Sequence, residues 1–599
     1  MAMTKDKIFN WRFCLCCGLF IWFVVNLLQG IFTEIQEDEA YYALYGEHLA
    51  WGYFDHPPMV GLMAFLGSIF FSGTLGVRFF TIIASCLSLF VMWEIAISRP
   101  FDTLRQAQGP LRDLSPSSLL LFFVIACSIV MFNIYGFVTT PDVSLILFSA
   151  LFLLVYQRYL VKKSWPKALL MGVFMALMVY SKYHAFLLLG LIVLSNLKLL
   201  KDGKFWVACL VALALLVPHV LWQVNNDFPS FRYHLMQRNE SFQWSYFLEY
   251  LPNQLLVFNP LTLGAVVYVL IKDRNCVRIP PAPLKRGKSE AQQTSVGVFE
   301  RGLKFILIGF FFFFWLMAFR GHVEPHWTIV CVIPVVVLAY RKALVDEKLR
   351  KYTLRFILPS LLLVLVFRIV LLTPLSARFG FGSQREYYQA IEQVAGDRPV
   401  VFRGSFQQPA LYHFYTGKES SSLKSYYDRK TQYDLWQFDK AWIGKEVFVG
   451  GPVYQLSKEY DINGVHFEGY LMPHFRSANR LITTFKIIND TENETPVFHR
   501  GDTIQMDFSI HNPCDVPVVF KDEQYGFNIK AHYLPGNQVS ICFFDRIEEL
   551  QPKVTCHGHL FTVVGDDVSE GQQQFNLGIG DRISSFVTEE SGVEIWIVP

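Results

Sequence analysis

Carboxylates gather directly after the first long apolar segment of the chain. Residues 34–58 read EIQEDEAYYALYGEHLAWGYFDHPP and contain no Lys or Arg. A carboxylate held near an acceptor hydroxyl can act as a general base, and Asp38 and Glu39 both suit that role. Neighbouring residues on a helix are offset by about 100°. We therefore expect one of the two to act as the base and the other to brace the loop.

Cations that suit a phosphate leaving group occur in later polar segments. Transfer of a group from a lipid phosphate leaves one phosphate, which needs positive charge but little protonation. Arg78, Lys182 and His56 can supply this charge, although Lys182 could instead snorkel to the membrane interface. Asp142 is a further acid. It could orient the base, bind sugar hydroxyls or simply cap a helix.

The composition predicts that a membrane holds these segments. The chain has 599 residues, 52% of them hydrophobic, and 56 are Phe. That is too apolar for one soluble domain. The net charge of +3 is spread in short basic clusters, which argues against a nucleic-acid groove. Apolar segments of bilayer length predict about eleven helical spans. They centre on 13–32, 77–97, 117–137, 143–160, 166–181, 184–200, 205–222, 251–271, 303–319, 326–340 and 354–374.

The distribution of Lys and Arg predicts the topology. If 57–72 lies along the interface as an amphipathic or re-entrant segment, most basic residues fall on one side. That side is expected to be cytoplasmic. It holds the amino end and the loops 99–116 and 273–302, which read as connectors without chemistry. The candidate residues then lie together at the outer face, where ionisable groups near a membrane usually line a functional site.

Six short motifs follow one another at the outer ends of these predicted spans. They are Asp38-Glu39-Ala40-Tyr41-Tyr42, His56-Pro57-Pro58, Gly76-Val77-Arg78, Thr140-Pro141-Asp142, Ser181-Lys182-Tyr183 and Glu324-Pro325-His326-Trp327. In this order they resemble the GT-C glycosyltransferases. The resemblance covers roughly residues 10–375. It is closest to the bacterial branch of the dolichyl-phosphate-mannose protein mannosyltransferases, which includes the lipid A aminoarabinose transferases.

The resemblance implies an inverting glycosyltransferase with a polyprenyl-phosphate-linked sugar donor, no required cofactor, and Asp38 as the base. It also marks Tyr183, Glu324 and His326 as substrate-binding residues. The lipid A branch carries Lys where this chain has His56, which leaves the phosphate contact at that position open. The sugar and the acceptor, whether glycolipid, polysaccharide or protein, are not predicted.

Other functions remain open from the residues alone. His322, Glu324 and His326 could bind a metal only if their loop folds back, and we do not expect one because a single donor phosphate needs no ion to neutralise it. A transporter or flippase is disfavoured because few polar residues fall near the bilayer midplane. A scaffold with an external binding domain is a further alternative.

The sequence changes character after residue 375. Residues 376–445 predict a small α/β subdomain, and residues 446–599 predict a β-rich, sandwich-like domain outside the membrane. A disulfide between Cys542 and Cys556 is possible there. We thus expect a multi-pass protein of a bacterial inner membrane whose active site and carboxyl-terminal domain are extracytoplasmic.

Overall fold

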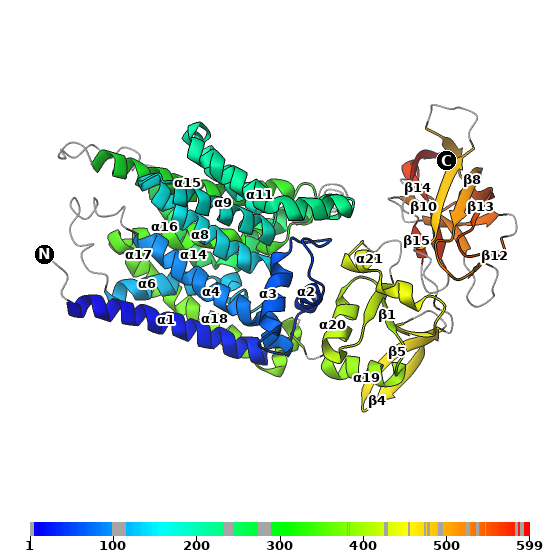
Figure 1. The fold of residues 1–599 in the computed structure, drawn as a ribbon, viewed down its shortest axis with the longest axis horizontal. Helices are drawn as coiled ribbons and strands as arrows, with labels where there is room; N and C mark the ends of the chain where they lie inside the picture. The colour runs from blue at the N-terminus through cyan, green and yellow to red at the C-terminus, as the bar shows by residue number, and fades with distance from the viewer. Residues whose placement is uncertain are drawn as a thin grey trace. The chain divides into compact units, whose positions relative to one another are not determined.

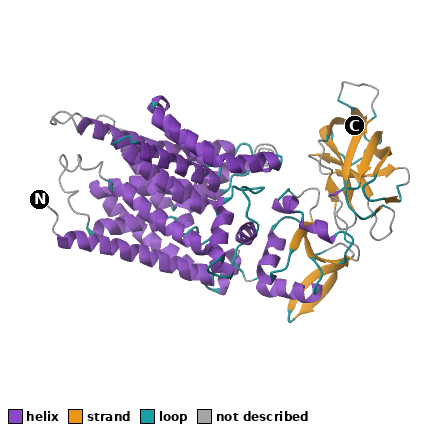
Figure 2. Cartoon of the chain, viewed as in Figure 1, coloured by secondary structure: helices purple, strands orange, loops and turns teal. Residues whose placement is uncertain are grey.

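The structure, a computed structural model, divides into two compact units, Met1–Ser383 and Gln384–Pro599 (Figure 1). It describes residues 5–599 except 99–114, 233–242, 273–288, 380, 383, 424–428, 453–455, 473–474, 476–479, 489–494, 521–527, 535–537, 545–546, 581–584 and 588–591. The first unit is helical, and the strands belong to the second (Figure 2). The predicted connector 99–116 lies almost entirely outside the described residues, and so do residues 273–288 of the connector 273–302. Residues 289–302 were predicted as part of a connector, but they form the first turns of a helix, α15 (Ser289–Met317).

Long apolar helices make up the first unit. Among the described residues, six are long and apolar enough to cross a membrane: Trp11–Phe32 of α1 (Lys5–Phe32), α4 (Gly73–Ile97), α8 (Pro141–Val161), α11 (Gly203–Asn225), Pro325–Val345 and Glu347–Val370. Shorter apolar helices, α6 (Pro116–Cys127), α9 (Trp165–Ser181) and α10 (Ala185–Ser195), cover further predicted spans. The helical membrane fold is confirmed, and the number of eleven spans stays a prediction.

The predicted span 251–271 is not one continuous helix. It is broken into α13 (Trp244–Phe258) and α14 (Pro260–Lys272), which meet at 99°. A residue before proline avoids helical backbone, and Asn259 accordingly has φ 67°. Its amide donates to Ser128 O at 3.2 Å and to Ser360 Oγ at 2.8 Å. The predicted span is thus a bent pair of helices that together are long and apolar enough to cross a membrane, and Asn259-Pro260 marks the break.

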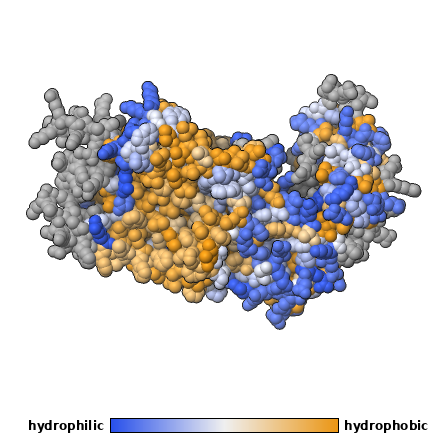
Figure 3. All heavy atoms as spheres, in the orientation of Figure 1, coloured by the Kyte–Doolittle hydropathy of each residue, from blue (hydrophilic) through white to orange (hydrophobic). Residues whose placement is uncertain are grey.

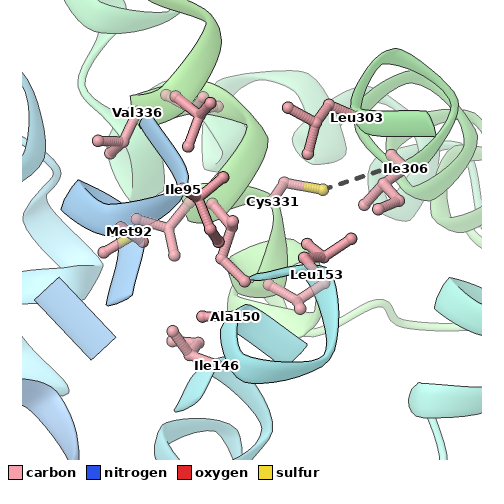
Figure 4. Packing of buried hydrophobic residues seen from close by; sticks show 14 of the residues in the cluster. Met92, Ile95, Ile146, Ala150, Leu153, Leu303, Ile306, Cys331 and Val336 are labelled. Atoms are coloured by element: carbon pink, nitrogen blue, oxygen red, sulfur yellow. Dashed lines mark hydrogen bonds between the residues drawn. The ribbon is translucent and has the colours of Figure 1, made fainter. Parts of the chain in front are cut away.

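The core of the first unit consists of aliphatic and aromatic side chains from several helices. Residues of α4, α8, α15 (Ser289–Met317) and α16 (Val332–Val345) interlock there (Figure 4). The outer surface is apolar too, and Phe20, Leu210 and Leu213 are more than 60% exposed (Figure 3). A surface of this kind suits a hydrocarbon surrounding.

Two short helices follow α1. They are α2 (Glu37–Glu47) and α3 (Met59–Ser68). At about 1.5 Å per residue, the ten residues of α3 are too short to cross a bilayer. α3 packs closely on both neighbours, because a Cβ on Gly46 would meet Phe65 N at 2.8 Å and one on Gly67 would meet Gly76 O at 2.0 Å. The length agrees with the non-spanning segment predicted at 57–72.

The second unit begins with a five-stranded sheet in the order β2-β1-β3-β5-β4. β1 (Val400–Arg403) pairs in parallel with β2 (Ser420–Leu423) and β3 (Val447–Gly450), and β5 (Val465–Met472) adds antiparallel to β3 and β4 (Lys458–Ile462). Helices α19 (Arg385–Ala395) and α20 (Gln407–Thr416) belong to this part. The α/β part thus extends beyond the predicted limit of 445, because strand periodicity does not reveal which sheet a strand joins.

A larger β-structure follows, with strand order β6-β8-β13-β11-β10-β14-β16-β7 and β15 beside β14. The strands are β6 (Ile482–Ile487), β7 (Val497–His499), β8 (Thr503–His511), β10 (Asn528–Leu534), β11 (Gln538–Phe544), β13 (Thr555–Val563), β14 (Gly571–Gly580), β15 (Ser585–Val587) and β16 (Val593–Val598). This confirms the β-rich domain.

The possible disulfide of this domain is absent. Cys542 pairs in register with Thr562, whereas Cys556 pairs with Ile510. Cys556 and Thr562 lie on the same strand, and six residues of a strand span about 20 Å. Both cysteines, and Cys514, are free thiols. The separation of Cys542 and Cys556 in the sequence does not reveal this offset in strand register.

Candidate active site

The polar segments singled out in the sequence meet at one end of the first unit. α1, α9 and α11 end there, whereas α4 and α8 begin there. The helices α2 and α3 lie at this end, opposite the end where α1 begins (Figure 1). Alternating chain direction therefore brings residues from distant parts of the sequence together.

Glu39 and Arg78 form a buried ion pair, and both side chains are 0% exposed. Arg78 Nε donates to Glu39 Oε1 at 2.8 Å, and Nη2 donates to Oε2. The carboxylate also accepts from Thr139 N at 2.8 Å and from Gln36 N at 3.2 Å. Glu39 thus joins α2 to α4 and to the segment before α8.

The Arg78 guanidinium uses all of its hydrogen-bonding capacity inside the protein. Besides Glu39, it donates to the carbonyl oxygens of Gly30, Thr33 and Glu34 at 3.3, 2.6 and 2.9 Å. A guanidinium has five N–H donors, and five contacts are made here. In this arrangement none is left for a phosphate, the contact that the sequence predicted for Arg78.

Asp38 has a different environment from its neighbour. It lies in the first turn of α2, where Gln36 and Glu39 form a capping box. The Asp38 side chain is exposed. One member of the pair is therefore held inside the protein and the other faces outward.

A second buried ion pair joins Asp142 and Lys182. Lys182 Nζ donates to both carboxylate oxygens at 2.9 and 2.8 Å, and the side chains are 9% and 2% exposed. Asp142 lies in the first turn of α8, and Lys182 directly follows α9. His326 Nε2 approaches Asp142 Oδ2 to 3.8 Å. The predicted residues Asp142, Lys182 and His326 are thus brought together.

The tyrosine Tyr42 connects these parts of the site electrostatically. Its ring lies edge-on to His56, with 5.7 Å between centroids. Burial raises the pKa of Tyr42 well above its usual value, and the charges of Asp38, Asp55 and Asp142 raise it further. Three carboxylates from three separate segments therefore surround one phenol.

The remaining predicted residues lie around this centre. Tyr183 exchanges a hydrogen bond of 3.0 Å with His219 Nε2 on α11. Glu324 faces His322 at 3.7 Å, and both are partly exposed. Glu324 precedes η5 (Pro325–Cys331), the 3₁₀ turn that carries His326. Within the described residues, no group of three His, Cys, Asp or Glu side chains has the geometry to hold a metal ion.

The chain was compared with protein-family models, curated proteins and solved structures. A family model described as dolichyl-phosphate-mannose-protein mannosyltransferase matches residues 110–222. The crystal structure of apo ArnT from Cupriavidus metallidurans has a TM-score of 0.52 at 14% identity, covering 76% of this chain and 97% of that chain. The structure of the same ArnT bound to undecaprenyl phosphate gives 0.50 at 15% identity, with the same coverage. No curated protein matches the chain by sequence.

The chain has the GT-C glycosyltransferase fold. This confirms the resemblance inferred from the six motifs. The matched family segment carries Asp142, Lys182 and Tyr183, whereas Asp38, His56 and Arg78 precede it.

Sequence reasoning gave no role to several residues of this candidate site. Asp55 is 5% exposed and acts on Tyr42. His219, Gln223 and Ser230, from α11 and α12 (Pro229–Arg232), are hydrogen-bonded around Tyr183 and are at most 4% exposed. The adjacent His56 is the only signal for Asp55. Polar residues within the last turns of an apolar helix were the available signal for His219 and Gln223.

Proposed function

We propose that this protein is an inverting glycosyltransferase that moves a sugar from a polyprenyl-phosphate donor to an envelope acceptor at the outer membrane face. The proposal rests on the different environments of the two neighbouring acidic residues, Asp38 and Glu39. Glu39 is buried and bonded on both oxygens, whereas Asp38 faces outward beside the same site. The GT-C fold supplies the reaction class, and these residues supply the chemistry.

Asp38 is the proposed general base. A base needs an oxygen that can receive the proton of an acceptor hydroxyl. Each oxygen of Glu39 already accepts two hydrogen bonds, from Arg78 and from a backbone N–H. Proton transfer to Glu39 would break the buried pair, which is costly. Glu39 and Arg78 therefore hold the loop in place, and Asp38 takes the proton.

Lys182 is the proposed contact of the donor phosphate. An ammonium has three N–H groups, and the described residues use two of them, both on Asp142. The third can donate to a phosphate oxygen while Asp142 holds the lysine side chain in place. His56, whose ring lies edge-on to Tyr42, is proposed as a second contact of the phosphate. Tyr183, Glu324 and His326 border the site and are proposed to contact the substrate.

The reaction follows from these positions. The acceptor oxygen attacks the anomeric carbon and forms the new glycosidic bond, while its proton passes to Asp38. The bond between the anomeric carbon and the phosphate oxygen breaks, and its electron pair leaves with the lipid phosphate. Lys182 stabilises the charge that develops on this oxygen. Attack from the face opposite the leaving group inverts the configuration.

The comparisons support a lipid-phosphate donor. The similar ArnT structure contains undecaprenyl phosphate, and the matched family is named for a dolichyl-phosphate sugar. The location in a bacterial inner membrane, with an extracytoplasmic site and carboxyl-terminal domain, rests on the predicted charge bias of the loops. We keep the donor at the level of polyprenyl-phosphate sugars and leave the acceptor as an envelope glycolipid, polysaccharide or protein.

Donor turnover tests the proposal. Purified full-length protein in detergent is incubated with undecaprenyl phosphate carrying radiolabelled mannose, glucose or 4-amino-4-deoxyarabinose, together with extracted envelope acceptors. We expect release of undecaprenyl phosphate from at least one donor, with label appearing in the acceptor fraction. A transporter or scaffold would leave every donor intact, and that result would overturn the proposal.

A further inference from the structure

A chain of hydrogen bonds surrounds Tyr183 and begins at a backbone carbonyl of the first outer loop. His219 Nδ1 lies 2.6 Å from Trp51 O, and His219 Nε2 lies 3.0 Å from the Tyr183 hydroxyl. A carbonyl can only accept, so Nδ1 carries the proton and Nε2 is left to accept. Tyr183 therefore donates its O–H to His219. Its oxygen then accepts from Gln223 Nε2 at 3.0 Å.

The other end of the chain is fixed in the same way. Ser230 Oγ donates to Tyr53 O at 2.9 Å. Because its only proton is used there, the Ser230 oxygen must accept from Gln223 Nε2, which lies 2.8 Å away. Both N–H groups of Gln223 therefore donate, one to Tyr183 and one to Ser230. The carbonyl oxygens of Trp51 and Tyr53 fix these directions through His219 and Ser230. Rotating the amide by half a turn would place its oxygen against two groups that have no proton to give.

These assignments leave the amide oxygen of Gln223 without a hydrogen-bond donor among the described residues. Gln223 is 1% exposed, and its Oε1 accepts no hydrogen bond from any residue that the structure describes. A buried acceptor without a donor is costly, so native proteins rarely leave one unfilled. No donor among the residues that the structure describes supplies the missing proton.

The position of this acceptor connects it to the proposed reaction. Gln223 is bonded to Tyr183, and Tyr183 directly follows Lys182, the proposed phosphate contact. Trp222, the neighbour of Gln223, packs against the first outer loop, because a Cβ on Gly52 would meet its ring at 2.4 Å. The residue that carries the unfilled acceptor is therefore linked by one hydrogen bond to Tyr183, a proposed substrate contact.

We propose that Gln223 Oε1 receives a hydroxyl of the sugar carried by the donor lipid, which makes Gln223 a sugar-binding and specificity-determining residue. The inference rests on the proposed function for the identity of the lipid. A hydroxyl has the proton that Oε1 lacks, whereas an ionised phosphate would be repelled and an acyl chain has nothing to donate. A site built around one substrate hydroxyl strongly rejects an analogue without it.

Binding of matched lipids tests the subsite without requiring transfer. Full-length protein in detergent is titrated with undecaprenyl phosphate alone and with undecaprenyl phosphate carrying mannose, glucose or 4-amino-4-deoxyarabinose. Gln223→Met should weaken binding of the best sugar-carrying lipid roughly 5- to 100-fold. Binding of undecaprenyl phosphate alone should change less than twofold. Asn225→Met, which replaces an exposed amide on the same turn, should change neither.

Three other outcomes are informative. If Gln223→Met weakens both lipids equally, Gln223 only positions Tyr183 and Lys182, and the sugar subsite is wrong. If it weakens neither, a water molecule fills the acceptor, and the inference is overturned. If wild-type protein binds no lipid at all, the proposed function fails instead.

A measurement on wild-type protein covers the case in which Gln223→Met does not fold. Monodeoxy analogues of the best donor are compared, each lacking one hydroxyl. Loss of one particular hydroxyl should weaken binding by the same factor as the Gln223 substitution. Equal binding of all analogues would overturn the subsite.

Discussion

Replacing Arg78 by methionine separates a bracing role from a phosphate-binding role. Arg78→Met removes both bonds to Glu39 and the three to backbone carbonyls. It leaves a carboxylate that is 0% exposed without its counter-charge. Breaking a buried pair in this way typically costs about 3–5 kcal/mol. Arg78→Lys keeps the charge but loses the fork that bonds both oxygens, so it should cost less.

Thermal unfolding of purified protein in detergent measures this effect. A loss of that size should lower the apparent Tm of the helical unit, Met1–Ser383, by roughly 4–6 °C. Adding Glu39→Gln to Arg78→Met should recover part of the loss, because the unpaired charge is then absent. Folded Arg78→Met protein should still bind undecaprenyl phosphate. A normal Tm together with lost lipid binding would refute the bracing role and restore the phosphate contact predicted from the sequence.

Three further predictions follow from other parts of the chain. Lys182→Ala should abolish donor binding, while Lys182→Arg should retain part of it because the charge remains; equal, near-normal binding by both variants would favour snorkelling instead. Burial lowers the pKa of His532 to about 4, so the unfolded chain takes up its proton first as the pH falls. His532 therefore adds stability above its unfolded pKa of about 6.5, and up to about 3 kcal/mol of this is lost as the pH falls to 4; unfolding curves of wild type and His532→Gln should converge at low pH, and parallel curves would contradict this. Cysteines at Ser72 and Ser420, in a background without reactive thiols, should react with an impermeant reagent in intact cells; protection until lysis would contradict the predicted topology.

The sequence predicted residues that the structure brings together, but not how each of them is held. Asp38, Glu39, Asp142 and Lys182 were singled out by type, order and placement between apolar segments. The structure then distinguished Asp38 from Glu39 by burial. Burial of a polar residue in a loop depends on partners distant in the sequence, such as Arg78 and Thr139. No local sequence pattern predicts which distant residues become these partners.

The fold was predictable where the hydrophobic pattern alone decides it. Helical spans and a β-rich carboxyl-terminal domain follow from periodicity, and both are present. The break at Asn259 required backbone reasoning about the following proline. The register that separates Cys542 from Cys556 depends on cross-strand pairing, which the sequence does not display. His219 and Gln223 were missed because they lie within an otherwise apolar helix.

The most direct test of the central claim compares Asp38→Asn with Glu39→Gln at matched amounts of folded protein. The transfer rate from a turned-over polyprenyl-phosphate sugar is measured for each, alongside its apparent Tm. Asp38→Asn should fall about 10²- to 10⁴-fold with an unchanged Tm, because only the base is lost. Glu39→Gln should lower the Tm and retain more activity per folded molecule. Normal turnover by Asp38→Asn, with an inactive but stable Glu39→Gln, would contradict the account and make Glu39 the base.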